Sequence, residues 1–120
     1  MGIKTHKDLD VYKDAMDFVV SIYQVTNSFP DNERYGLTSQ MRRAAVSIPS
    51  NIAEGAARKN TKEFIQFLHH SLGSASEIET QLELAKRLSF IEEVNTLEEN
   101  VHSIINRLTA LIKSLQKNLK

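Results

Sequence analysis

The sequence predicts an all-α protein, folded as an antiparallel, up-down-up-down four-helix bundle. Apolar residues recur at 3-4 spacing over four long stretches, which is the spacing of one face of an α-helix. Only two prolines and four glycines occur, too few for many short strands and turns. With 120 residues, the chain has enough length for one core and too little for two. We therefore expect one domain over residues 1–120, with helices at about 8–28, 35–58, 61–88 and 91–118.

The first expected helix carries two adjoining apolar stripes. One stripe consists of Leu9, Tyr12, Met16, Val19 and Tyr23, and the other of Val11, Ala15, Phe18, Ile22 and Val25. Together they cover more of the helix than one bundle core requires. Two interpretations stay open: a single wide core face, or a second seam that meets another subunit. Phe29-Pro30 ends the helix, because the residue before a proline is pushed out of the α region.

The second helix is expected to begin near Glu33–Thr38, with a polar ladder beside an apolar arc. The arc consists of Leu37, Met41, Ala44, Ile48, Ile52 and Gly55, and the ladder of Gln40, Arg43, Ser47, Asn51, Glu54 and Arg58. Each ladder residue can reach the next, because side chains three or four positions apart are neighbours. Pro49 removes a backbone donor and predicts a kink. Since the apolar spacing keeps its phase through Ile52, we expect the helix to continue past it.

The third helix opens with a capping box, formed by Asn60 and by Glu63 three residues later. Its apolar seam consists of Phe64, Leu68, Ser71, Ala75, Ile78, Leu82 and Ala85. A glycine inside a helix costs about 1 kcal/mol relative to alanine. We therefore expect Gly73 to be there for the close approach of another backbone.

The fourth helix is expected to start from a second capping box, Ser89 with Glu92. It has the most regular pattern in the chain, a heptad seam with no polar residue in it. The seam consists of Val94, Leu97, Val101, Ile104, Leu108, Leu111 and Leu115, widened by Ile105, Ile112 and Leu119.

Composition excludes several classes of protein. The chain has no cysteine, which rules out disulfide frameworks, thiolate metal sites and thiol nucleophiles. No apolar run approaches the roughly 20 residues that span a bilayer. Residues 1–8 lack the apolar stretch of a secretory signal. We expect a cytoplasmic protein without a membrane partner.

Catalytic and metal sites are poorly supported. Di-metal sites in helical bundles require two Glu-x-x-His pairs, and Glu99-x-x-His102 is the one match in the sequence. His102 also projects about 100° away from the core position Val101, so we interpret it as a solvated histidine. No phosphate-binding glycine loop or serine–histidine–acid arrangement can be assembled. The sequence predicts no enzyme, no metal and no cofactor.

Charge is balanced overall and uneven along the chain. Fifteen basic and fifteen acidic residues cancel, yet residues 34–62 contain six basic residues and one acid, whereas residues 63–99 contain two basic residues and eight acids. The candidate nucleic-acid contacts are Arg42, Arg43, Arg58, Lys59 and Lys62. One interpretation is ordinary solvated charge, with Arg58 paired to Glu54. The other is a patch that binds phosphates, repeated around a symmetric oligomer.

The adjacent arginines are expected to differ in role, because they point about 100° apart on the helix. Arg43 lies in the polar ladder, so we expect it to fix helix or subunit geometry. Arg42 projects on the opposite side, near Val46 and Pro49, and is expected to be freer to meet a phosphate.

The segment from Tyr35 to Gly55, YGLTSQMRRAAVSIPSNIAEG, closely resembles the signature of the four-helix-bundle proteins encoded in 23S ribosomal RNA intervening sequences. Phe29-Pro30, Lys62-Glu63-Phe64 and Gly73-Ser74 support the resemblance, and His69-His70 departs from the smaller apolar residues usual in the family. By resemblance, the motif positions are Gln40, Arg42, Arg43, Ser47, Pro49, Asn51, Glu54 and Gly55.

The resemblance implies an antiparallel bundle that assembles into a homopentameric ring. It also relates the chain to the accessory variability proteins of diversity-generating retroelements, which bind nucleic acid and a reverse transcriptase. Two hypotheses of function remain. The first is an oligomer that binds RNA or DNA through the basic patch, and the second is a protein-interaction scaffold with no nucleic-acid ligand.

Overall fold

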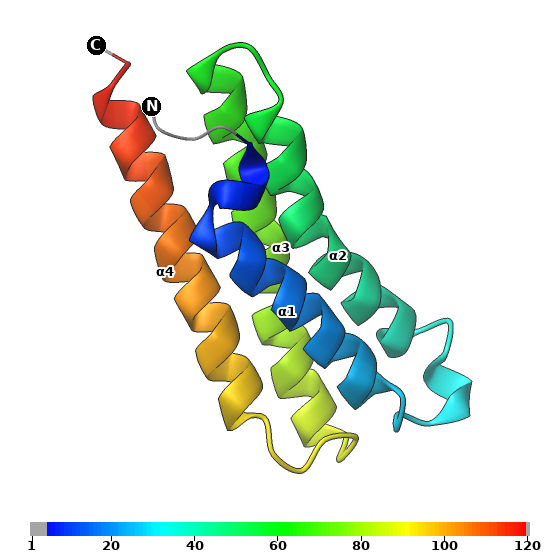
Figure 1. The fold of residues 1–120 in the computed structure, drawn as a ribbon. Helices are drawn as coiled ribbons and strands as arrows, with labels where there is room; N and C mark the ends of the chain where they lie inside the picture. Colours follow the sequence, from blue (N-terminus) through cyan, green and yellow to red (C-terminus); the bar gives the residue numbers. More distant parts are fainter. Residues whose placement is uncertain (1–4, 120) are drawn as a thin grey trace.

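The computed structural model describes residues 5–119 and confirms the predicted antiparallel four-helix bundle (Figure 1). Every regular element among the described residues is helical. The bundle is built from α1 (Asp10–Thr26), α2 (Leu37–Ala56), α3 (Thr61–Arg87) and α4 (Asn95–Lys117). Two short 3-10 helices, η1 (His6–Asp8) and η2 (Asp31–Glu33), precede α1 and α2. None of these helices is long and apolar enough to cross a membrane.

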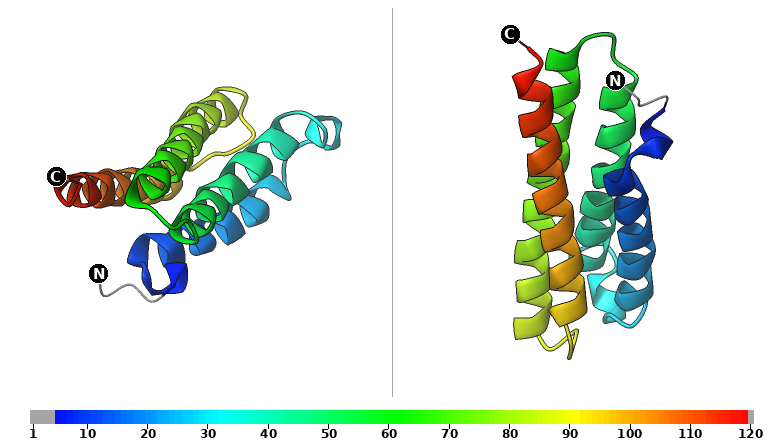
Figure 2. Two further views of the ribbon diagram at one scale, coloured as in Figure 1. Left: turned by 90° about the horizontal axis from the view of Figure 1, so that it is seen from above. Right: turned by 60° about the vertical axis from the view of Figure 1, so that its left-hand side comes forward.

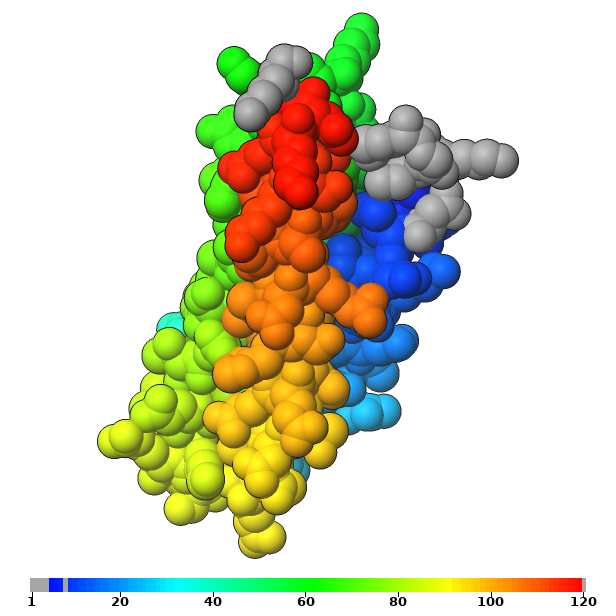
Figure 3. Space-filling view, turned by 90° about the vertical axis from the view of Figure 1, so that its left-hand side faces the viewer, coloured from blue at the N-terminus to red at the C-terminus, as the bar shows by residue number. Residues whose placement is uncertain are grey.

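Each helix packs against the next along the chain, and α4 returns to pack against α1. The helices form two layers of antiparallel pairs, α1 with α2 and α3 with α4 (Figure 2). In Figure 3, α4 lies across the front of the molecule between α3 and α1. This order leaves a groove on either flank of α1, one toward α2 and one toward α4.

The core takes one apolar stripe from each helix. From α1 it takes Val11, Ala15, Phe18 and Ile22, and from α4 it takes Val101, Ile104, Leu108, Ile112 and Leu115. The other stripe of α1 lies at the edge of the bundle. There, Met16 remains 46% exposed and Tyr23 42% exposed. Leu9, Tyr12 and Val19 of the same stripe are partly buried against the core. Within the chain, α1 therefore buries one stripe deeply and the other in part.

The capping predictions have opposite outcomes. Asn60 caps α3 as expected, its side-chain oxygen accepting a hydrogen bond from the Glu63 amide at 2.9 Å. Ser89 does not cap α4, so that prediction is wrong. It follows the end of α3 with a φ of 62°, and the amides of Ser89 and Phe90 bond back to the carbonyls of Lys86 and Ala85. This is a Schellman closure of α3, and α4 consequently begins at Asn95 rather than near residue 91.

The close approach expected at Gly73 occurs at Gly55 instead. A Cβ on Gly55 would lie 2.7 Å from the Cβ of Phe67, which is too short for two carbon atoms. A Cβ on Gly73 would meet no atom within 4 Å, since Gly73 is exposed. Gly55 thus allows the end of α2 to pack on the start of α3, whereas Gly73 approaches no other backbone within residues 5–119.

Pro49 lies inside α2, which confirms the prediction of a continuous helix. Its side chain is buried. One residue earlier, the carbonyl of Ile48 accepts a hydrogen bond from the fully buried hydroxyl of Ser71 on α3, at 2.8 Å. The region around the proline is therefore tied to the neighbouring helix by a side-chain hydrogen bond.

Candidate nucleic-acid interface

The five candidate basic residues fall into two groups at opposite ends of α2. Arg42 and Arg43 lie within the first two turns, whereas Arg58, Lys59 and Lys62 surround the connection to α3. At 1.5 Å per residue, the fifteen positions from Arg43 to Arg58 span roughly 20 Å. The two groups can be considered as separate surfaces.

The group at the α2–α3 connection is partly neutralised. Arg58 forms an ion pair with Glu54 at 3.1 Å, as expected, and its guanidinium lies 4.8 Å from the centre of the Phe67 ring. Lys59 and Lys62 are exposed and form no ion pair with any residue in the range 5–119. This surface carries two unpaired charges on flexible side chains.

Arg42 ties the start of α2 to the end of α1, so the expectation that it is free is wrong. Its Nε donates to the Thr26 hydroxyl at 2.8 Å and its Nη2 donates to the Asn27 side-chain oxygen at 3.1 Å. The guanidinium also lies 4.6 Å from the centre of the Tyr23 ring. Because Thr26 and Asn27 end α1, Arg42 brings a positive charge to the negative end of that helix dipole.

Arg43 is the freer of the two arginines within the described residues. It is exposed, and it forms no hydrogen bond or ion pair with any residue that the structure describes. Arg34, at the end of η2, is also exposed and has no carboxylate partner in that range. Both guanidinium groups keep their full hydrogen-bonding capacity for an external ligand.

Arg34, Arg42 and Arg43 border one groove between the end of α1 and the start of α2. This groove, which we call the basic groove, has a volume of about 590 Å³. Its lining consists of Tyr23, Arg34, Tyr35, Thr38, Ser39, Arg42, Arg43, Val46 and Ser47. The lining includes no carboxylate. Five side chains with a hydroxyl group and three guanidinium groups make it a surface rich in donors.

Two tyrosines complete the basic groove, and neither is predicted as a site residue from the sequence. Tyr35 is 88% exposed, with the Arg34 guanidinium 5.8 Å from its ring centre. Tyr23 comes from the edge stripe of α1. One signal was available for Tyr35: a large aromatic residue between Arg34 and Gly36, outside every apolar stripe, has no core position to fill.

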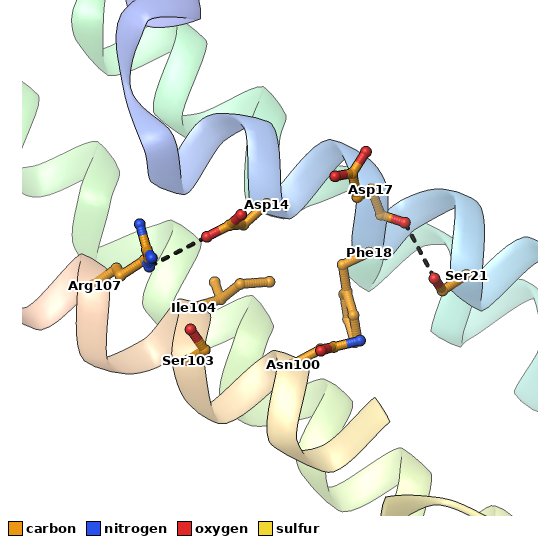
Figure 4. A pocket seen from close by; sticks show the side chains of 8 residues that line it. All are labelled: Asp14, Asp17, Phe18, Ser21, Asn100, Ser103, Ile104 and Arg107. Carbon is orange, nitrogen blue, oxygen red and sulfur yellow. Dashed lines mark hydrogen bonds and ion pairs between the residues drawn. The ribbon is translucent and has the colours of Figure 1, made fainter. Parts of the chain in front are cut away.

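The groove on the other flank of α1 has a different chemistry. This acidic groove, about 360 Å³ in volume, is lined by Asp14, Asp17, Phe18, Ser21, Asn100, Ser103, Ile104 and Arg107 (Figure 4). Its one arginine, Arg107, is paired: Nε lies 3.2 Å from an Asp14 carboxylate oxygen, and Nη1 lies 3.9 Å from Asp10. Asp17 has no cationic partner among residues 5–119. The acidic groove therefore retains an uncompensated negative charge.

Histidine and acidic side chains do not gather into a metal site in the described part of the chain. No group of three or more is close enough to hold an ion. His102 is largely exposed, and its Nε2 contacts the Glu79 carboxylate across the α3–α4 interface. Glu79, Glu99 and His102 consequently do not form a metal site within residues 5–119.

Comparison with known proteins connects this geometry to a family. Residues 7–116 match the model of the 23S rRNA-intervening sequence proteins. The chain belongs to this family. A crystal structure from Bacteroides thetaiotaomicron VPI-5482, of a protein with unknown function from the S23 ribosomal protein family, has a TM-score of 0.79 and 26% identity. The similarity covers 86% of this chain and 95% of that one. No curated protein matches the chain.

Several family motif positions hold the bundle together. The Asn51 side-chain amide donates to the carbonyl and the hydroxyl of Ser47, at 2.8 and 2.9 Å. The hydroxyls of Ser47 and Ser74 share a hydrogen bond of 2.8 Å between α2 and α3. Together with Arg42, Gly55 and the buried Pro49, these residues fix how α2 packs on its neighbours. Gln40, Arg43 and Glu54 are the exposed motif positions without a contact to another helix in residues 5–119.

An apolar strip lies next to the basic groove. It is a shallow groove of about 280 Å³ between α1 and α2, lined by Tyr12, Met16, Val19, Val46, Pro49, Ser50 and Ala53. Val46 lines both grooves, so the two surfaces are continuous. The strip includes Tyr12, Met16 and Val19 of the edge stripe of α1, for which a second seam was an open interpretation.

Proposed function

We propose that this member of the family is a non-enzymatic, oligomeric protein that binds RNA or DNA through the basic groove. The observation that carries the proposal is the concentration of uncompensated positive charge in a neutral protein. Three arginines line the basic groove without a carboxylate, none of them has an ion pair within residues 5–119, and the side chains of two of them form no hydrogen bond there either. Arginine binds phosphate oxygens through two parallel hydrogen bonds, so this lining fits a nucleic-acid backbone.

Oligomerisation would supply what one chain lacks. Each phosphate that a protein neutralises adds to affinity, and one subunit offers few free cations. We propose that the apolar strip on α1 and α2 packs against a second copy of the chain, and the family resemblance implies a pentamer. Because the strip adjoins the basic groove, a ring would place the grooves of neighbouring subunits near its subunit contacts and repeat them around it.

The binding test measures fluorescence anisotropy of labelled RNA and DNA at two salt concentrations. We expect the affinity of the wild-type protein to fall as salt rises, with a slope set by the number of phosphates contacted. Arg43→Gln should weaken binding and flatten that slope. Lys113→Gln is the matched control, because Lys113 is an exposed cation on α4, away from the basic groove. Equal affinities and slopes for both variants would contradict the proposal.

The assembly test uses light scattering at micromolar concentration. We expect the mass of an oligomer, that is, several times the 13.6 kDa of one chain. Replacing Met16 with lysine should shift the mass toward the monomer, because a charge would be buried in the subunit contact. A monomeric mass for the wild-type protein would contradict the proposal that it forms an oligomer.

The scaffold hypothesis has one observation in its favour, the exposed apolar strip. A strip of this kind can dock a different protein as well as a second copy. If the oligomer forms and no nucleic acid binds at low salt, the scaffold becomes the preferred function. In that case the charge in the basic groove would serve a protein partner.

A further inference from the structure

The basic groove presents aromatic rings as well as guanidinium groups. From this combination we infer that its ligand is an unpaired, single-stranded stretch of nucleic acid rather than a duplex. The inference rests on the proposed function and specifies the form of nucleic acid that the groove takes.

Tyr35 is the first reason. Its ring is 88% exposed, on the short segment between η2 and α2, beside a free arginine. An exposed ring can stack on an unpaired base, and stacking of this kind is a general mode of binding single strands. A duplex keeps its base faces inside the stack, so it could use the arginines of the groove and not the ring.

Tyr23 is the second reason, because its ring is held in place before any ligand arrives. The Arg42 guanidinium lies over it at 4.6 Å, and that guanidinium is itself fixed by Thr26 and Asn27. The ring still remains 42% exposed. A fixed platform loses little conformational entropy when a base stacks on it.

The size and lining of the groove are the third reason. A volume of about 590 Å³ lies within the range of pockets that enclose small molecules, and a single nucleotide belongs to that size class. The hydroxyl groups of Thr38 and Ser39 can bond to base edges, while the exposed Arg34 and Arg43 can bind phosphates. This arrangement suits a nucleotide turned into the groove, with its backbone running along the rim.

The test compares three probes with the intact protein. They are oligo(U) and oligo(dT) of about 12 nucleotides, within the site sizes of single-strand binders, and a mixed-sequence duplex of similar length. Anisotropy is measured at about 50 and 200 mM salt, where phosphate contacts have their largest effect on affinity. We expect the single strands to bind about tenfold more tightly than the duplex, because only they can stack on the tyrosines.

Two variants separate stacking from charge. Tyr35→Leu keeps an apolar side chain and removes the ring, so single-strand affinity should fall about tenfold with an unchanged salt slope. Tyr35→Phe keeps the ring and should bind like the wild type. The chain has three tyrosines and no tryptophan, so intrinsic tyrosine fluorescence provides a second readout. Oligo(U) should quench the wild-type signal, and the quenching should be smaller in Tyr35→Phe although binding is kept.

The outcomes distinguish this inference from the proposed function. If the duplex binds as tightly as the single strands and Tyr35→Leu binds like the wild type, the inference is overturned and nucleic-acid binding stands. If none of the probes binds at low salt, the proposed function fails as well. If Tyr35→Leu changes the oligomer mass, Tyr35 belongs to a subunit contact and the inference is overturned.

Discussion

The two grooves that flank α1 have similar construction and opposite charge. Each lies between α1 and a neighbouring helix and combines charged side chains with hydroxyl groups. In the acidic groove, the arginine is paired with two aspartates and a further aspartate remains unpaired. In the basic groove no carboxylate lines the surface, and Arg34 and Arg43 have no ion pair within residues 5–119.

The two grooves show that the net charge of a neutral protein does not predict where on its surface an anion can bind. What matters is whether the cations of a surface are compensated by neighbouring carboxylates. Arg107 and Arg43 are both exposed arginines on helices, yet only Arg43 has an uncompensated charge. We therefore expect variants of the basic groove to alter nucleic-acid binding and matched variants of the acidic groove to leave it unchanged.

The largest expected effect comes from reversing the charge of the basic groove. In Arg34→Glu/Arg43→Glu, two free cations become two anions that face the phosphates. Like charges juxtaposed across an interface cost several kcal/mol, so affinity should fall by about 100-fold or more. Both residues are exposed, so thermal unfolding and oligomer mass should stay at wild-type values.

Reversing the acidic groove is the control for this prediction. Asp14→Lys/Asp17→Lys makes the same number of reversals with the opposite sign. Affinity that rises slightly or stays constant agrees with the comparison. An equal loss in both double variants would mean that the basic groove is not the contact surface.

The next largest effect is on stability and separates the adjacent arginines. Arg42→Ala removes hydrogen bonds from a charged donor to Thr26 and Asn27, which should cost about 1.5–3 kcal/mol of unfolding free energy. Arg43→Ala, at an exposed position without a partner in residues 5–119, should change stability by less than about 0.5 kcal/mol. Chemical denaturation of both variants measures the difference. Equal losses would mean that Arg43 has a structural contact as well.

The fold could be predicted from periodicity because each helix has to bury one stripe. The bundle class, the Asn60 cap and the passage of α2 through Pro49 all followed from local rules. The start of α4 could not be predicted in this way, because Ser89 matches a capping box and yet adopts the positive φ that closes α3. Glycine is the usual residue in that conformation, and no local pattern indicates that a serine takes it here.

The site was predictable only in part. Spacing identified Arg42 and Arg43 as pointing apart, which is correct, yet it predicted Arg42 to be the freer of the two, whereas within residues 5–119 Arg42 is hydrogen-bonded and Arg43 is not. Which of the two faces a neighbour depends on how α1 packs on α2, and the partners of Arg42 lie 15 and 16 residues earlier in the chain. The aromatic part of the groove was missed for the same reason, since Tyr23 and Tyr35 come together only through that packing.

A smaller effect is expected from breaking the ion pair in the acidic groove. In Asp14→Asn, Arg107 loses its partner at 3.2 Å and keeps the more distant Asp10. Both members of the pair are about half exposed, so the loss of stability should be about 0–1 kcal/mol and should shrink as salt rises. Nucleic-acid affinity should stay within about twofold of wild type, since Asp17 still repels phosphates.

The smallest and most specific test adds one arginine to each groove by the same substitution. Ser39 lines the basic groove and Ser103 lines the acidic groove. In Ser39→Arg the new charge has no carboxylate in its groove, so it should raise single-strand affinity about threefold and steepen the salt slope by about 0.7 for each added phosphate contact. Its position in the first turn of α2 should cost about 0.3–1 kcal/mol of stability, because it opposes the helix dipole.

In Ser103→Arg the guanidinium enters a groove that contains Asp14 and Asp17, and pairing with them should leave affinity unchanged. If Ser103→Arg raised affinity as much as Ser39→Arg, total charge rather than local compensation would control binding, and the comparison of the two grooves would lose its explanatory value.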